Sequence, residues 1–151
     1  MTPEDFARIE QDLSVSLSQA YRAALMRPEF QSEEAGFQEF SGDADEIIGL
    51  NLEVWEEGFH GVKWPDHYLV IGEDGAGNNY FTDLTKERPA VFLADHEQTS
   101  NKKRLVTSET YETFADFLAF IHRLQAEVEK TMEPEEQVEA GPAKKPWWRF
   151  W

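Results

Sequence analysis

Residues 68–84 of this 151-residue chain read YLVIGEDGAGNNYFTDL, and this stretch decides the fold. Two runs rich in β-branched and aromatic residues, 68–71 and 80–84, flank a connection that contains three glycines. Glycine and asparagine tolerate the positive φ angles of tight turns, so we predict two antiparallel strands joined by a hairpin. A phosphate-binding loop is disfavoured, because an aromatic strand rather than a helix follows the glycines.

The flanking sequence extends this strand pair into an antiparallel meander. Residues 90–93 are a third β-type run after a turn at 85–89, and such short links exclude the long crossover that parallel neighbours need. We also expect a strand followed by a short helical turn within 47–55, and a loop with a short element at 29–45. The prediction is an α+β fold, an antiparallel sheet of about four to six strands flanked by N-terminal and C-terminal helices.

Helix signals stand at both ends of this region. A threonine cap with proline and aspartate at residues 2–5 begins an N-terminal helix, and Pro28 ends it. Ser16 with Gln19 offers a second capping box, which would restart or kink this helix. Residues 113–128 begin with a threonine cap and carry an apolar stripe at helical spacing, so they predict the last helix.

Charge is the strongest global feature of the sequence. The chain has 30 acidic and 14 basic residues, for a formal charge of −16, and residues 1–60 hold 14 acidic but only 3 basic side chains. Nucleic-acid binding is disfavoured, because phosphate contacts need a basic surface. The acidic excess is either a solvated surface or a surface complementary to a basic partner. The hydrophobic fraction of 40% predicts a folded chain.

Several classes of site are disfavoured by composition and spacing. The absence of cysteine excludes disulfides and thiolate sites, and no apolar run is long enough to span a bilayer, so we expect a cytoplasmic protein without stable membrane insertion. The sequence holds neither HExxH nor GxSxG, and we expect no metal, no cofactor and no enzymatic activity. An enzyme that uses Asp95, His96 and Glu97 is a weaker alternative.

The C-terminal segment differs from the rest of the chain. We predict a binding domain at 1–131, followed at 132–151 by an acidic linker and a tail that reads KKPWWRFW. Tryptophan and arginine are frequent binding hot spots. The tail either docks on its own domain or stays free, and we favour a free or loosely attached recognition segment. Its candidate contacts are Trp147, Trp148, Arg149, Phe150 and Trp151.

Five segments follow one another in an order that is typical of a known family. They are the helix start at 17–22, the strand at 68–72, the turn at 75–78 with the strand at 80–84, the segment at 91–97, and the helix start at 114–118. In this order the chain resembles the SUKH superfamily, particularly the branch typified by the fungal cell-wall-assembly regulator, over roughly residues 14–128. One departure is Ser18, which stands where the family pattern usually has a proline, and a serine can cap a helix.

The resemblance implies an α+β domain with a non-enzymatic, protein-binding role. Bacterial members of the family look mostly like immunity proteins that bind a cognate toxin, often a basic nuclease, and block it. On this basis the first hypothesis is a toxin-neutralising immunity protein. The alternative is an adaptor or regulatory scaffold that recruits its partner through the KKPWWRFW tail. The predicted contacts beside the hairpin are Trp64, Glu73, Asp74, Asn78, Asn79 and Tyr80.

Overall fold

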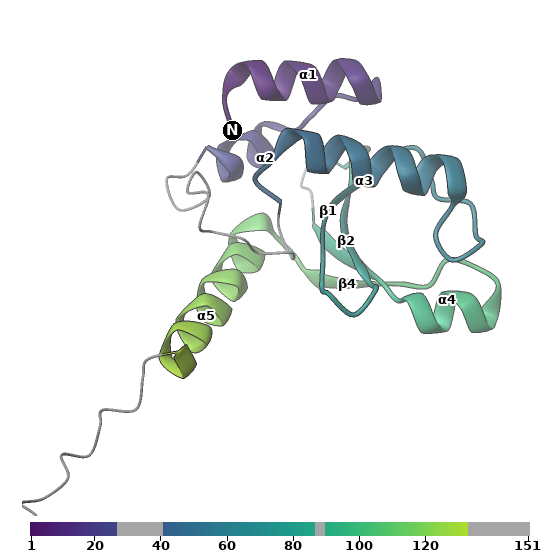
Figure 1. Ribbon diagram of the computed structural model, residues 1–151. Coiled ribbons are helices and arrows are strands. Elements are labelled where there is room, and N and C mark those ends of the chain that lie inside the picture. The colour runs from purple at the N-terminus through teal and green to yellow at the C-terminus, as the bar shows by residue number, and fades with distance from the viewer. Residues whose placement is uncertain (27–40, 87–89, 133–151) are drawn as a thin grey trace, which may run out of the picture.

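The computed structural model describes residues 1–26, 41–86 and 90–132 (Figure 1). Helices flank a four-stranded antiparallel sheet within these ranges, so the predicted α+β class is confirmed. Residues 27–40, 87–89 and 133–151, which include most of the predicted loop at 29–45 and the tail, lie outside the described part. The elements are α1 (Pro3–Leu13), α2 (Gln19–Leu25), α3 (Ala44–Glu57), β1 (Tyr68–Glu73), β2 (Asn79–Asp83), β3 (Val91–Ala94), α4 (His96–Lys102), β4 (Thr107–Tyr111) and α5 (Phe114–Met132).

Two helices form the N-terminal part of the chain. α1 begins at the predicted capping box of Thr2 and Asp5, and it ends where Ser14 adopts a left-handed conformation. The predicted restart is confirmed, but its cap is Ser18 and not Ser16. The Ser18 hydroxyl accepts a hydrogen bond from the Tyr21 amide (3.1 Å) and so begins α2.

α3 occupies the residues that we expected to begin as a strand, and that prediction is wrong. Asp43 caps the helix by accepting a hydrogen bond from the Glu46 amide (3.0 Å). The side chains of Ile47, Asn51 and Val54 are buried, and their spacing of four and then three residues is that of a helix. Other apolar residues lie between these positions, so the helical spacing could not be recognised in the sequence.

The four strands pair in chain order, each antiparallel to the next. The hairpin predicted at 68–84 is confirmed, because Tyr68 pairs with Asp83 and Glu73 pairs with Asn79. A bulge between Val70 and Gly72 interrupts this ladder. β3 pairs with β2 as the predicted meander requires.

α4 and β4 fill a segment for which the sequence indicated only a polar break. Asp95 accepts a hydrogen bond from the Gln98 amide (2.8 Å), which ends β3 and begins α4. The buried Thr99 hydroxyl then accepts a hydrogen bond from the Val106 amide (3.0 Å) and fastens the helix to the start of β4. Neither element has an apolar stripe, so periodicity did not reveal them.

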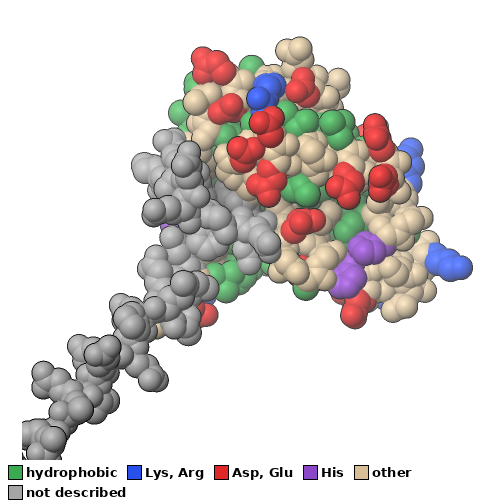
Figure 2. All heavy atoms as spheres, viewed as in Figure 1, with side chains coloured by type: hydrophobic (Ala, Val, Ile, Leu, Met, Phe, Trp, Pro, Cys, Tyr) green, Lys and Arg blue, Asp and Glu red, His purple; other side chains and the backbone are tan. Residues whose placement is uncertain are grey.

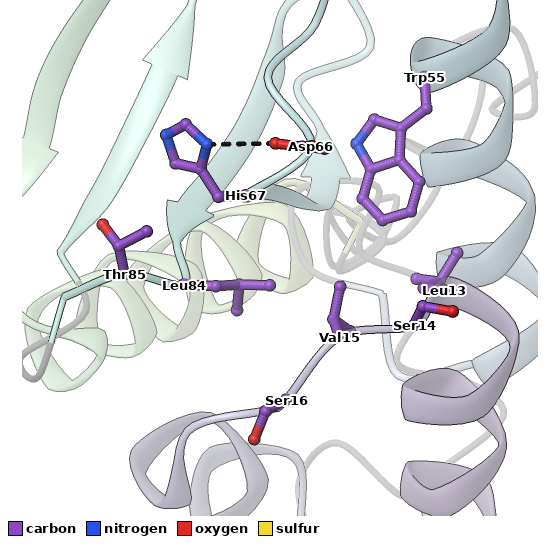
Figure 3. Close-up of a pocket in the computed structure, with 9 residues that line it drawn as sticks. All are labelled: Leu13, Ser14, Val15, Ser16, Trp55, Asp66, His67, Leu84 and Thr85. Atoms are coloured by element: carbon purple, nitrogen blue, oxygen red, sulfur yellow. Dashed lines mark hydrogen bonds and ion pairs between the residues drawn. The ribbon is translucent and has the colours of Figure 1, made fainter.

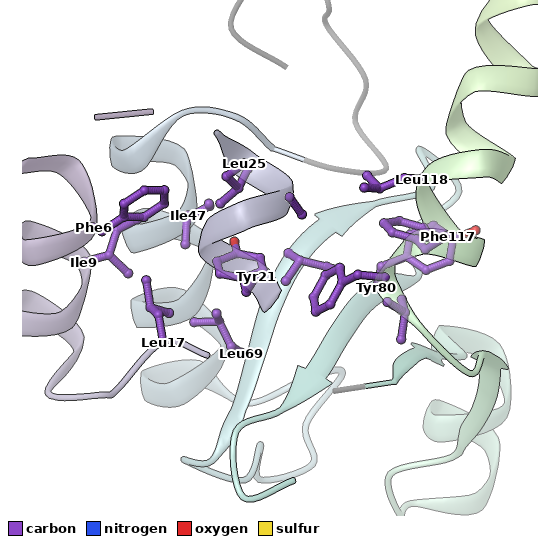
Figure 4. Close-up of a cluster of buried hydrophobic side chains, with 14 of the residues drawn as sticks. Phe6, Ile9, Leu17, Tyr21, Leu25, Ile47, Leu69, Tyr80, Phe117 and Leu118 are labelled. Atoms are coloured by element: carbon purple, nitrogen blue, oxygen red, sulfur yellow. The ribbon is translucent and has the colours of Figure 1, made fainter. Parts of the chain in front are cut away.

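The two faces of the sheet pack into two clusters. Leu69, Ile71 and Tyr80 join α1, α2 and α5 in the larger cluster, where the rings of Tyr80 and Phe117 lie 5.2 Å apart (Figure 4). The opposite face packs against the end of α3 and the segment that follows it. This second cluster consists of Val54, Phe59, Trp64, Val70, Phe81 and Ala94.

Asn51, on α3, closes the outer edge of the sheet at β1. Its side chain is fully buried, its Oδ1 accepts a hydrogen bond from the Val70 amide (2.8 Å), and its Nδ2 donates to the Val70 carbonyl (2.9 Å). Nδ2 also donates to the carbonyl of Ile47 (2.8 Å) within the helix. One side chain thus makes the pair of bonds that another strand would make. The bonds hold the C-terminal half of α3 beside the β1–β2 hairpin.

Candidate protein-binding surface

The glycine-rich turn is organised around the carboxylate of Asp74. This carboxylate accepts hydrogen bonds from the amides of Ala76 (2.9 Å) and Asn78 (3.0 Å) and from the Asn78 side chain (2.6 Å). Partial burial opposes ionisation, but these bonds prevail and lower the pKa of Asp74. Gly75 and Gly77 have φ angles of 72° and 94°, which only glycine adopts easily. Because Asp74 occupies amides that a phosphate would need, the segment is a structural turn.

Asn78 ties this turn to α4. Its Oδ1 accepts a hydrogen bond from the His96 amide (2.9 Å) and lies 2.9 Å from His96 Nδ1. The His60 ring lies 5.4 Å from the His96 ring, measured between centroids. The glycine-rich turn, α4 and the loop after α3 therefore lie next to one another.

A cleft of about 380 Å³ opens beside this junction. We call it the acidic cleft, because Glu53, Glu57 and Glu73 are among the residues that line it. Gly58, which ends α3, allows the tight turn of its wall, since a Cβ there would lie 2.6 Å from the Val62 carbonyl oxygen. The other lining residues are Leu50, Val54, Phe59, His60, Gly61, Gly77 and Asn79.

The carboxyl group of Glu73 is the electrostatic centre of this cleft. Partial burial, followed by the negative charges of Glu53, Glu46 and Asp74, raises the pKa of Glu73. The charged form is thus disfavoured by its surroundings. A cationic group in the cleft would relieve the repulsion, so the cleft favours a basic ligand.

The acidic cleft is part of a broader acidic face. Figure 2 shows acidic side chains spread over the face formed by α1 and α3, with histidines beside them. Arg8 on α1 pairs with Asp45 (2.5 Å), whereas Glu56 and Glu57 carry no ion pair with another described residue. We use the name acidic face for the exposed acids of α3 together with Glu73. These are Asp45, Glu46, Glu53, Glu56, Glu57 and Glu73.

The structure divides the predicted contact residues into two groups. Trp64 and Tyr80 are only 1% and 7% exposed and belong to the two core clusters, so neither side chain can reach a partner. The Trp64 indole instead donates a hydrogen bond to the Tyr68 carbonyl (2.9 Å). Asn79 is 3% exposed and is one of the residues that line the cleft.

Glu73, Asp74 and Asn78 lie together at the hairpin, as the sequence suggested. Whether they contact a partner stays a prediction. The tail residues Trp147, Trp148, Arg149, Phe150 and Trp151 lie outside the described ranges.

Residues of the acidic face on α3 were missed in the sequence, although a signal was present. Glu53 and Glu57 stand four residues apart, so they lie on one face of a helix. The predicted strand followed by a turn did not place them together. Recognising Asp43 as a helix cap would have grouped them.

The side chains of Asp95, His96 and Glu97 have separate surroundings. Asp95 caps α4 and also accepts a hydrogen bond from the Gln98 side chain (2.8 Å), and these bonds lower its pKa. His96 contacts Asn78, and Glu97 is exposed. Among the described residues, no group of three or more histidine or acidic side chains is placed to hold a metal ion.

A second hollow, of about 490 Å³, lies where the α1–α2 link meets the ends of α3 and β2 (Figure 3). Leu13, Val15, Trp55 and Leu84 supply its apolar lining, and His67 lies 3.5 Å from Asp66 at its edge. We call it the apolar hollow. The Trp55 indole nitrogen is buried and has no hydrogen-bond partner in the described part of the chain.

The fold and this surface define a class of protein, an α+β domain that presents an acidic cleft beside a hairpin. The chain belongs to the SMI1 / KNR4 family (SUKH-1), whose family model matches residues 1–119. No curated protein and no solved structure matches the chain. In the described residues, no helix is both long and apolar enough to cross a membrane.

Proposed function

We propose that this chain is a non-catalytic immunity-type protein, which binds a cognate toxin in the cytoplasm and neutralises it by occlusion. The observation that carries the proposal is the crowding of carboxylates around Glu73 in the acidic cleft. Membership of a family whose domains bind protein partners supports the same conclusion.

The charge of the acidic face suits a toxin that acts on nucleic acid. A nuclease presents a basic surface to the phosphates of its substrate, and an acidic protein can cover that surface. Complementary charge would also speed association at low salt and suppress binding to acidic proteins. The backbone hydrogen bonds of the hairpin and of α3 fix the positions from which the carboxylates project, so the backbone needs little ordering on binding.

The first test is whether a gene for a larger secreted protein with a toxin-like C-terminal domain lies beside the gene for this chain. If it does, the second test is whether the chain protects cells that produce that domain. We expect co-expression of the full chain to restore growth and the two purified proteins to form a complex. Glu57→Lys, on the cleft lining, should weaken this complex by about tenfold or more. The matched control is Glu112→Lys, an exposed glutamate before α5 and outside the acidic face, and it should change affinity by less than about threefold.

Equal weakening by both substitutions would mean that only net charge matters and that the cleft is not the binding site. Absence of any complex with a neighbouring toxin domain would overturn the proposed function. Both variants should unfold at the same temperature as the parent protein, because both side chains are exposed.

The second candidate is an adaptor that recruits its partner through the KKPWWRFW tail. Three tryptophans and an arginine in eight residues favour it, because these residues dominate binding hot spots. Deleting residues 142–151 separates the candidates. An adaptor loses its partner on deletion, whereas an immunity protein that works through the acidic face still protects.

A further inference from the structure

Two histidine rings lie side by side where the loop after α3 meets α4. The centroids of the His60 and His96 rings are 5.4 Å apart, and the ring planes are inclined by 42°. Two imidazoles that bind one tetrahedral metal ion through bonds of about 2.0–2.1 Å place their centroids about 5.3 Å apart, because each centroid lies about 1.2 Å behind its nitrogen. The observed separation therefore fits two ligands of one ion.

The hydrogen bonds of His96 determine which of its ring nitrogens is available to such an ion. Asn78 donates through Nδ2 to the Asp74 carboxylate (2.6 Å). The oxygen of the same carboxamide accepts from the His96 amide and lies 2.9 Å from His96 Nδ1. In the neutral ring Nδ1 therefore carries the proton and donates to this oxygen, and Nε2 keeps its lone pair. Histidine ligands of metals are commonly held in this way, through an acceptor bound to the other ring nitrogen.

His60 is presented by a tight turn. Phe59 and Val62 exchange two backbone hydrogen bonds (2.8 and 3.0 Å). Between them, His60 and Gly61 have φ angles of 49° and 77°, as in a type I′ turn. Asparagine and glycine are favoured at the first of these positions, so the turn alone does not account for a histidine there. Sparsely populated backbone conformations of this kind are concentrated at functional sites.

We propose that His60 and His96 bind one zinc ion, Zn²⁺, and leave its other coordination positions to water. Zinc takes imidazole ligands and a tetrahedral geometry. Within the described ranges no third histidine or acidic side chain completes the set, so the site is open. Glu57 and Glu73 line the same cleft as His60, and their negative charge attracts a cation. A bound ion links the turn at His60 to α4, and the inference does not depend on any toxin.

The first experiment measures zinc binding by calorimetry, with the full chain and without a histidine tag. We expect one Zn²⁺ to bind per chain, and His60→Asn and His96→Asn each to weaken binding by about tenfold or more. Both variants should stay folded. Asparagine suits the left-handed backbone at position 60, and at position 96 its amide can still donate to Asn78 although the Nε2 ligand is lost.

Two controls separate this pair from other metal ligands. His67→Asn removes an imidazole from the edge of the apolar hollow, and it should change zinc affinity by less than about twofold. Excess Mg²⁺ should not displace the zinc, because magnesium prefers oxygen ligands.

NMR spectroscopy locates the ion independently of the variants. Cu²⁺ binds imidazole sites more tightly than Zn²⁺ does, and its unpaired electron broadens the signals of nearby amides. The amides of Gly61 and Glu97 should therefore be lost early in a Cu²⁺ titration. Without metal, the ring ¹⁵N signals of His96 should show the tautomer with its proton on Nδ1.

Several results would overturn the proposal. These are the absence of zinc binding, unchanged affinity in either asparagine variant, and displacement of the ion by Mg²⁺, which would assign it to the carboxylates of the acidic cleft. Broadening centred on His67 or His122, or a His96 ring with its proton on Nε2, would refute it as well. None of these outcomes bears on toxin binding, so the two proposals fail separately.

Discussion

Replacing Asn51 with alanine would open the closed edge of the sheet. The Val70 amide and carbonyl would both lose their partner, and Val70 is fully buried. Each buried polar group without a partner costs about 1–3 kcal/mol, so the two together set a range of about 2–6 kcal/mol. Water that enters the vacated space recovers part of this, and we expect a loss of about 2–4 kcal/mol. That is a large share of a typical unfolding free energy of about 5–15 kcal/mol.

The assay is urea unfolding at equilibrium, followed by circular dichroism, together with amide hydrogen exchange. Leu52→Ala is the control, because Leu52 is 42% exposed on the same helix, and its loss should stay within about 0.5 kcal/mol. The Val70 amide should lose protection in the Asn51 variant more than the Phe81 amide, which lies in the middle of the sheet. A loss below about 1 kcal/mol for Asn51→Ala, or equal losses in both variants, would refute the reasoning.

Three further predictions concern single side chains. Ser18→Ala should lower the unfolding free energy by about 1 kcal/mol, because it removes the cap of α2, and Ser16→Ala should have almost no effect in the same urea titration. Glu73→Gln should stabilise the protein at neutral pH. The pKa of Glu73 is raised in the folded state, so the stability of the parent protein falls as the pH rises from the ordinary carboxyl pKa through the raised one. The unfolding curves of variant and parent should therefore converge in acid. Trp64→Ala should lower the unfolding free energy by about 3–5 kcal/mol, measured by thermal or urea unfolding, because the side chain is buried. The molecules that remain folded should bind the partner with unchanged affinity. A loss of affinity without a loss of stability would mean that Trp64 contacts the partner.

Local signals in the sequence predicted the parts of the fold that depend on neighbouring residues. The hairpin follows from glycine and asparagine between two β-type runs, and α1 follows from a capping box formed by two side chains three positions apart. The acidic surface could be predicted only as a charge excess. Its position on α3 and beside Glu73 depends on how α3 packs against the sheet.

The remaining features depend on contacts between distant residues. α4 has no apolar stripe, and its cap by Asp95 looks in the sequence like the continuation of a strand. Tyr80 was predicted as a partner contact beside the hairpin, but its ring packs against that of Phe117, which comes 37 residues later in the chain. The cleft brings together α3, the loop after it and the hairpin, and no local pattern encodes their meeting.

The hydrogen bonds between Asn51 on α3 and the strand β1 determine how the sequence of such a domain can vary. The hydrogen bonds between Asn51 and residue 70 involve only the peptide atoms of residue 70. They therefore do not depend on which side chain stands there, provided that the residue is not a proline, which lacks an N–H. Packing limits the size of that side chain, but the helix stays in register with the strand through any change that fits. The exposed carboxylates of α3 can therefore be exchanged to suit a new partner while the position from which they are presented stays the same.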